Sequence, residues 1–162
     1  MILCEQLQKR YGKKVILSSV SFAIDEPKII GLIGRNGVGK STLLKMLAGH
    51  LKSSSGTIEV VGKKAFQNLT VAANTILIED SMTFPGVLTL KEILQNAPKF
   101  YPNFALDLAF ELLKFSGISD KNHHHQLSKG QKAAFDLLYG IASRSAVTLL
   151  DEPMNGMDET IR

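Results

Sequence analysis

An eight-residue run, residues 34–41 with the sequence GRNGVGKS, has glycines, a lysine and a hydroxyl residue at the spacing of a phosphate-binding loop. Glycines let the backbone curl so that successive N–H groups point at phosphate oxygens. Lys40 is placed to reach the β- and γ-phosphates of a nucleoside triphosphate, and the Ser41 hydroxyl can ligate Mg²⁺. A helix that starts at Ser41 would also present its positive end to the anion. The spacing therefore predicts a site for a nucleoside triphosphate with Mg²⁺.

Two acidic residues, Asp151 and Glu152, directly follow an apolar run at residues 146–150. Carboxylates at the carboxyl end of a strand lie at the sheet edge where ligands bind in open α/β folds. Asp151 can hold Mg²⁺, directly or through water, and Glu152 can orient or deprotonate an attacking water. The alternative is a strand that ends in a solvated acidic turn, and the phosphate loop upstream favours the catalytic interpretation.

The elements that position these residues are predicted from hydrophobic patterning. Residues 28–33 form a nearly continuous apolar run, which is typical of a strand buried on both faces in a parallel sheet. Residues 41–49 have the leucine spacing of an amphipathic helix. This order of strand, loop and helix favours a phosphate site over an incidental glycine-rich turn. Further strands are expected at residues 2–7, 14–24, 57–61, 75–78 and 146–150, and further helices at residues 90–96, 104–115 and about 129–143.

These elements predict one α/β domain over residues 1–162. Its core, with a mainly parallel sheet and N-terminal antiparallel β strands, is expected to comprise residues 1–80 and 144–162. A helical subdomain of about residues 81–143 is expected to be inserted into that core. The length of 162 residues and the hydrophobic content of 44% are sufficient to bury such a core.

The composition limits the function classes. The net charge of +4 is compatible with a phosphate ligand, an anionic membrane or nucleic acid, but the basic residues are scattered, so no nucleic acid partner is expected. The single cysteine, Cys4, excludes a disulfide within the chain and favours a reducing, cytosolic compartment. The first residues lack the order of a signal peptide, and no apolar run approaches the ~20 residues of a membrane span. Work at a membrane would therefore require a partner.

A third motif, Leu127-Ser128-Lys129-Gly130-Gln131, stands between the phosphate loop and the acidic pair, and Ser128 is expected to cap the following helix. With the three motifs in this order, the chain resembles the ATP-binding subunit of ABC transporters over nearly all of its length. The fold implied is that of a P-loop NTPase. The family signature is usually LSGGQ. The LSKGQ version and residues 100–104 are similar to bacterial exporters related to antibiotic-resistance and peptide-immunity systems.

The resemblance implies that ATP and Mg²⁺ are bound between two ATP-binding subunits paired head to tail, as a homodimer or pseudo-dimer. Ser128 and Gly130 of one chain would act on the γ-phosphate held by the other, and Glu152 would be catalytic. Tyr11 would stack on adenine, although a turn tyrosine is the alternative, and Glu79 stands where the family usually has a metal-touching glutamine. The residues implied in nucleotide binding are Tyr11, Gly34, Arg35, Asn36, Gly37, Val38, Gly39, Lys40, Ser41, Thr42, Ser128, Gly130, Gln131 and Asp158, and those implied in metal binding are Ser41, Asp151 and Glu79.

The resemblance also implies a transmembrane permease subunit as the partner that uses the energy of hydrolysis. The chain would then be cytoplasmic and peripheral on the inner face of the cell membrane. Residues 84–88 and 100–101 are candidates for docking the permease, with ordinary packing inside the helical subdomain as the alternative.

Family members continue beyond the position of Arg162 with a strand whose histidine contacts the γ-phosphate. The chain is therefore expected to be C-terminally truncated, to bind ATP weakly and to hydrolyse it poorly. Two other functions stay open at this stage. One is a catalytically impaired ATP-binding fragment or regulatory module, and the other is a non-transport ABC ATPase that acts on the ribosome or DNA.

Three adjacent histidines, His123, His124 and His125, suggest a metal site. Adjacent side chains point in different directions on any regular element, so three ligands for one ion are not expected from this run. A solvated loop is the prediction.

Overall fold

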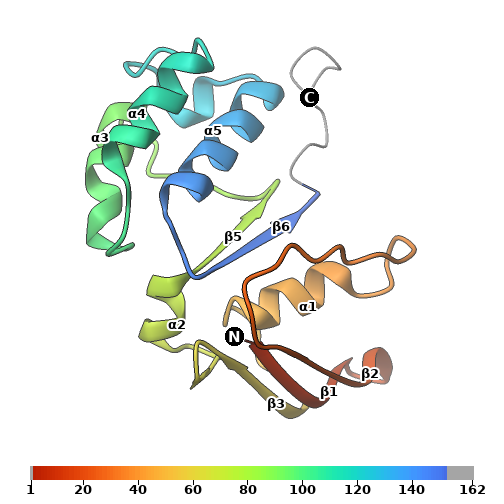
Figure 1. The fold of residues 1–162 in the computed structure, drawn as a ribbon. Coiled ribbons are helices and arrows are strands. Elements are labelled where there is room, and N and C mark those ends of the chain that lie inside the picture. The colour runs from red at the N-terminus through yellow and green to blue at the C-terminus, as the bar shows by residue number, and fades with distance from the viewer. Residues whose placement is uncertain (1, 153–162) are drawn as a thin grey trace. The chain divides into compact units, whose positions relative to one another are not determined.

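The computed structural model of the chain describes residues 2–152. The chain divides into two compact units, Met1–Thr75 and Ile76–Arg162 (Figure 1). The elements form an α/β fold with antiparallel strands at the N-terminus, as the patterning predicts. The expected grouping of residues 1–80 with 144–162 in one core stays a prediction.

The first unit contains a four-stranded antiparallel sheet in the order β2-β1-β3-β4. Its strands are β1 (Ile2–Tyr11), β2 (Lys14–Ile24), β3 (Ser55–Val60) and β4 (Lys63–Lys64). Gly12, with a φ of +57°, makes the tight turn between β1 and β2. The helices of this unit are α1 (Lys40–Leu47) and a short α2 (Leu69–Asn74), and the buried face of α1 contacts β3.

One strand prediction in this unit is wrong. Residues 28–33 form no strand in the part of the chain that the structure describes, and Ile29 and Ile33 are fully exposed. An apolar run becomes a buried strand only when a neighbouring strand takes its backbone N–H and C=O groups. No described strand pairs with this segment, so its backbone and side chains face solvent.

The second unit contains a two-stranded sheet of β5 (Thr75–Glu79) and β6 (Val147–Asp151), whose arrows run in the same direction (Figure 1). Its helices are α3 (Leu90–Asn96), α4 (Leu106–Phe115) and α5 (Lys129–Ala142), with 3₁₀ turns η1 (Ala97–Lys99) and η2 (His124–Gln126). The strand expected at residues 146–150 is only partly buried, because Leu149 is covered while Leu150 is 46% exposed.

The core of the second unit forms where β5, the three helices and the loop after β5 meet. The fully buried side chains include Phe135 and Leu90, and the ring of Phe84 packs edge-on against Phe135 and Tyr139. Gly140 faces Ile78, so the absence of a side chain lets α5 lie close to β5. Among the described residues, we find no helix that is both long and apolar enough to cross a bilayer.

Candidate functional site

The phosphate-binding loop runs directly into α1, which begins at Lys40, one residue earlier than expected. Gly39 is the N-cap residue of this helix, and no side chain caps its N–H groups. The first N–H groups of a helix have no partners inside the helix, and Leu43 N–H is the first to bond back, to the Gly39 carbonyl at 2.9 Å. This helix end therefore presents backbone donors and a positive dipole end to an anion.

Gly39 is required here for two reasons. Its φ of +107° lies in the region that residues with side chains rarely adopt. A Cβ atom at this position would also lie 2.9 Å from Ile16 Cγ2 and 3.1 Å from Leu17 Cδ2, so β2 closes directly against the loop. The loop is curled further by Gly37, with a φ of +78°. These features fit the cradle that a triphosphate requires.

The Lys40 side chain folds back over the loop. Its ammonium donates to the Gly34 carbonyl at 2.8 Å and approaches the Arg35 carbonyl at 3.4 Å. A cation is thereby held above the curled backbone, where phosphate oxygens would meet it. Ser41 and Thr42 follow in the first turn of α1. The residues named from the sequence, 34–42, therefore comprise the loop and the helix start that follows it.

Tyr11 ends β1 at the hairpin turn, and 52% of its surface is exposed. The Lys9 ammonium lies 4.8 Å from the centroid of the Tyr11 ring. The sequence reasoning did not find this contact, although an i, i+2 pair on one strand face is a signal that could have found it.

The predicted acidic residues stand at the ends of the two strands in the second unit. Glu79 is the last residue of β5 and Asp151 the last of β6, and the two strands run in the same direction (Figure 1), so both residues stand at the carboxyl end of the sheet. Oxygen ligands of this kind fit Mg²⁺. Glu152 follows, exposed and with a φ of +50°, a conformation that is often found at functional sites. Asp158 lies outside the described residues.

Ser128 caps α5, as the sequence predicts. Its hydroxyl accepts from the Gln131 N–H at 3.3 Å, and the Gln131 side chain accepts from the Ser128 N–H at 3.0 Å. This reciprocal capping box fixes the backbone of residues 128–131. The Gln131 side-chain oxygen accepts from the Ser128 N–H, so in this structure Gln131 stabilises the start of α5.

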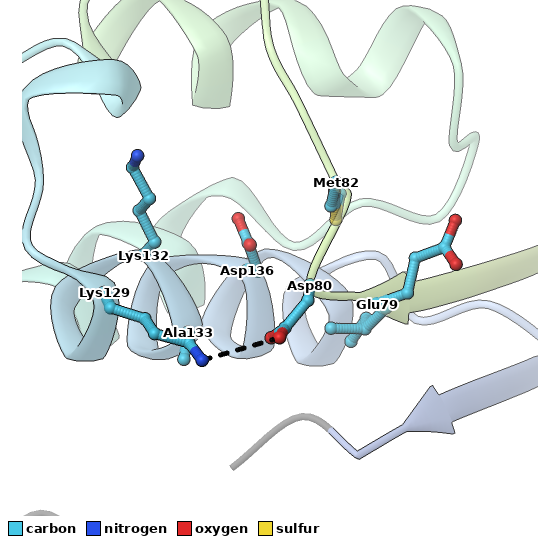
Figure 2. A pocket seen from close by; sticks show the side chains of 8 residues that line it. Glu79, Asp80, Met82, Lys129, Lys132, Ala133 and Asp136 are labelled. Atoms are coloured by element: carbon cyan, nitrogen blue, oxygen red, sulfur yellow. Dashed lines mark ion pairs between the residues drawn. The ribbon is translucent and has the colours of Figure 1, made fainter. Parts of the chain in front are cut away.

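A pocket of about 250 Å³ lies between the last residues of β5 and the first half of α5 (Figure 2). The Lys129 ammonium and the Asp80 carboxylate face each other at 3.7 Å across part of this pocket. The residue that departs from the usual LSGGQ pattern is thus paired with the neighbour of Glu79. The lining comprises Ile78, Glu79, Asp80, Met82, Lys129, Lys132, Ala133 and Asp136.

The prediction that the three histidines form a solvated loop is wrong for His124. Its Nε2 lies 2.8 Å from Asp136 Oδ1, and both side chains are only 8% exposed. Burial raises the pKa of the Asp136 carboxyl above its usual range, and the hydrogen bond and charge of His124 offset part of that rise. The pair arises because Asp136 lies on the buried face of α5, where a carboxylate needs a partner.

The two docking candidates differ in exposure. Phe84 is packed against the His124, Phe135 and Tyr139 rings, and Tyr101 packs against Tyr139. These contacts agree with the alternative of ordinary packing. Val87 and Phe100, in contrast, are 84% and 66% exposed.

The sequence matches a known protein family and several related proteins. The sequence pattern described as "ABC transporter" matches residues 17–155. The ABC transporter ATP-binding protein YtrB of Bacillus subtilis is 33% identical over 162 residues, which are 100% of this chain and 56% of that protein. The aliphatic sulfonates import ATP-binding protein SsuB 1 of Burkholderia lata is 31% identical over 158 residues, which are 96% of this chain and 47% of that protein. This chain therefore spans about half the length of these relatives.

A solved structure shares the fold. The dimeric post-hydrolysis structure of the ATP-binding cassette MJ0796, bound to ADP and Pi, superposes with a TM-score of 0.83 at 19% identity, over 99% of this chain and 78% of that chain. The family pattern covers most of the chain, including the phosphate loop, the LSKGQ motif and the acidic pair. The chain belongs to the ABC transporter family, as an ATP-binding cassette with the P-loop NTPase fold.

Proposed function

We propose that the chain binds ATP with Mg²⁺ and, paired head to tail with a second ATP-binding subunit, hydrolyses it to drive an exporter subunit in the membrane. The observation that carries this proposal is the uncapped start of α1, with the Lys40 ammonium held over the Gly34 and Arg35 carbonyls. A triphosphate would replace these carbonyls as the partner of Lys40 and accept from the free N–H groups of the helix start.

The acidic edge of the second unit supplies the catalytic groups of this proposal. Ser41, Asp151 and Glu79 are proposed as ligands of Mg²⁺, which when bound neutralises charge on the β- and γ-phosphates. Glu152 is proposed to orient the attacking water and to accept its proton. Its exposed position directly after β6 supports that role.

The proposed second subunit completes the site. Ser128 and Gly130 stand at the start of α5, where the capping box presents a rigid helix end and Lys129 adds a positive charge. We propose that this end meets the γ-phosphate bound to the other copy. The dimeric structure of the cassette MJ0796 supports pairing with a second copy.

The proposed membrane partner accounts for the transport names of the relatives. The chain would act in the cytoplasm, peripheral on the inner face of the membrane, with the exposed Val87 and Phe100 as contact candidates. The LSKGQ likeness supports an exporter as the partner.

A catalytically impaired ATP-binding module is the second candidate function. Residues 28–33 are exposed and pair with none of the described strands, which favours this function, because the segment leads directly into the phosphate loop. Hydrolysis that is absent while ATP still binds would identify this function.

The first experiment compares the purified chain with its Lys40→Met and Glu152→Gln variants. Lys40→Met removes a charged hydrogen-bond donor, so it should weaken ATP binding by roughly 10- to 100-fold, measured by isothermal titration calorimetry with Mg²⁺. Glu152→Gln should retain binding but lose hydrolysis, and hydrolysis per wild-type chain should rise with chain concentration if a second copy is required. The exposed Lys63→Met in β4 is the matched control for charge.

The proposal fails if Lys40→Met binds ATP as tightly as the Lys63→Met control does. Equal hydrolysis by wild type and Glu152→Gln would refute the role of Glu152 alone. Hydrolysis that is independent of chain concentration would refute the role of the second subunit.

A further inference from the structure

Lys9 and Tyr11 form a pair on β1 that the proposed function does not use. The two residues are separated by one position, so their side chains leave the same face of the strand. The Lys9 ammonium lies 4.8 Å from the ring centroid of Tyr11, within the range of a cation–π contact. Since 52% of Tyr11 is exposed, the ring is accessible to a ligand while it carries this contact.

The Lys9 ammonium also has a hydrogen-bond partner in a distant segment of the chain. Its ammonium donates to the Lys52 carbonyl at 2.7 Å, and the Lys9 side chain is half-buried. Two neighbouring hydrogen bonds fasten the same part of β1 to the segment after α1: Arg10 N–H donates to Ser54 Oγ at 3.0 Å, and Ser54 N–H donates to the Gln8 carbonyl at 2.9 Å. The end of β1 is therefore tied to the chain that leaves the helix of the phosphate loop.

We propose that Lys9 is a positioning residue for the nucleotide base. Its ammonium, anchored on Lys52, occupies one face of the Tyr11 ring and leaves the opposite face for the purine of ATP. This inference rests on the proposed binding of ATP, and it takes Tyr11 as the residue that stacks on the base, as the family resemblance implies.

The physical argument concerns the freedom of the ring. A tyrosine at the end of a hairpin can turn about its side-chain bonds, and a ligand that stacks on it must restrict that motion. A cation fixed on one face restricts the ring before ATP arrives, so less conformational entropy is lost on binding. The anchor also ties the strand that carries the ring to the segment that follows α1.

The test compares two ligands that differ in the base. ATP and inorganic tripolyphosphate are each titrated by calorimetry into the wild-type chain and the Lys9→Met variant. Loss of ring positioning should weaken ATP binding about three- to tenfold and leave tripolyphosphate binding unchanged, since tripolyphosphate has no base to stack. Lys9→Arg should restore ATP affinity, because a guanidinium also lies over aromatic rings.

Two further variants separate the contacts of Lys9. Lys9→Gln keeps a hydrogen-bond donor on the side chain but places no charge on the ring, so it should behave as Lys9→Met does. In a Tyr11→Ala background, Lys9→Met should have no further effect on ATP binding. Lys63→Met controls for the loss of one positive charge, and thermal unfolding of each variant checks the fold.

Several results would overturn the inference. ATP binding that is unchanged or tighter in Lys9→Met would mean that the cation does not position the ring for the base. An equal loss for ATP and tripolyphosphate would show a general effect of charge or structure. A wild-type chain that binds neither ligand would refute the proposed function itself, which distinguishes the two failures.

Discussion

At the scale of single residues, the His124–Asp136 pair shows how burial changes the behaviour of a titratable group. Asp136 lies in the apolar interior beside Phe135, and its carboxyl receives one hydrogen bond from His124 at 2.8 Å. Desolvation outweighs this bond, so the pKa of Asp136 is raised above its ordinary value of 3.8. The folded chain therefore binds this proton more tightly than the unfolded chain does.

The consequence for stability has a definite sign. A raised pKa means that Asp136 favours folding below pH 3.8, and that this contribution is lost as the pH rises through the raised pKa. We predict that the free energy of unfolding of wild type, minus that of Asp136→Asn, decreases as the pH rises from 3.8 through the raised pKa of Asp136. Urea unfolding at a series of pH values measures this difference. A difference that grows with pH in this window would contradict the direction of the shift.

At the scale of elements, two helices of the second unit, α3 and α5, begin at local capping signals. Thr89 and Glu92 form a capping box at the start of α3, and Ser128 and Gln131 form another at the start of α5. The positions of these two helices follow from residues within one turn of their ends. How closely α5 lies on β5 depends on Gly140, which faces Ile78.

We predict that Gly140→Ala destabilises the chain by about 1–2 kcal/mol, although alanine is the better helix former by about 1 kcal/mol. The added methyl would overlap the Ile78 side chain, so either α5 or Ile78 must move. Chemical denaturation of Gly140→Ala, Ile78→Val and the double variant tests this. The double variant should be more stable than the sum of the two changes implies, because valine lacks the Cδ1 atom that the methyl meets. Additive effects would show that the contact is not the cause.

At the scale of the whole molecule, the two compact units carry different parts of the proposed function. The phosphate loop and Tyr11 belong to the first unit, whereas Glu79, Asp151 and the LSKGQ motif belong to the second. We therefore expect ATP binding by one chain and contact with a second copy to protect different residues from hydrogen exchange.

Hydrogen exchange with mass spectrometry can separate these two events. In dilute chain, saturating ATP should protect residues 34–47 and leave residues 128–131 unchanged, and at 100 times the Kd it should stabilise the fold by about 2.7 kcal/mol. At high chain concentration, protection should extend to residues 128–131, because the start of α5 then meets the nucleotide of the second copy. The Lys40→Met variant is the control that should show neither effect. Protection of residues 128–131 that does not depend on chain concentration would contradict the head-to-tail arrangement.

The accuracy of prediction from the sequence differed from element to element. The helix at Leu90–Asn96 and the Ser128 cap were predicted correctly, because the periodicity and the capping residues lie within a few positions of each other. The strand expected at residues 2–7 extends to Tyr11 in the structure. The short α2 was missed even though Asn68 caps it. The strand at residues 28–33 was wrong, because an apolar run does not reveal whether a neighbouring strand exists to pair with it.

The sequence alone determined the chemistry of the phosphate loop, the order of the three motifs and the family to which they point. These depend on residue types at fixed spacing, and backbone rules translate such spacing directly into a curled loop or a capped helix. Only the tertiary structure decided which distant side chains meet: the Lys9 ammonium on Tyr11 and Lys52, His124 on Asp136, and Lys129 on Asp80. Contacts of this kind depend on how separate segments pack, and packing is set by the whole fold rather than by any short stretch of chain.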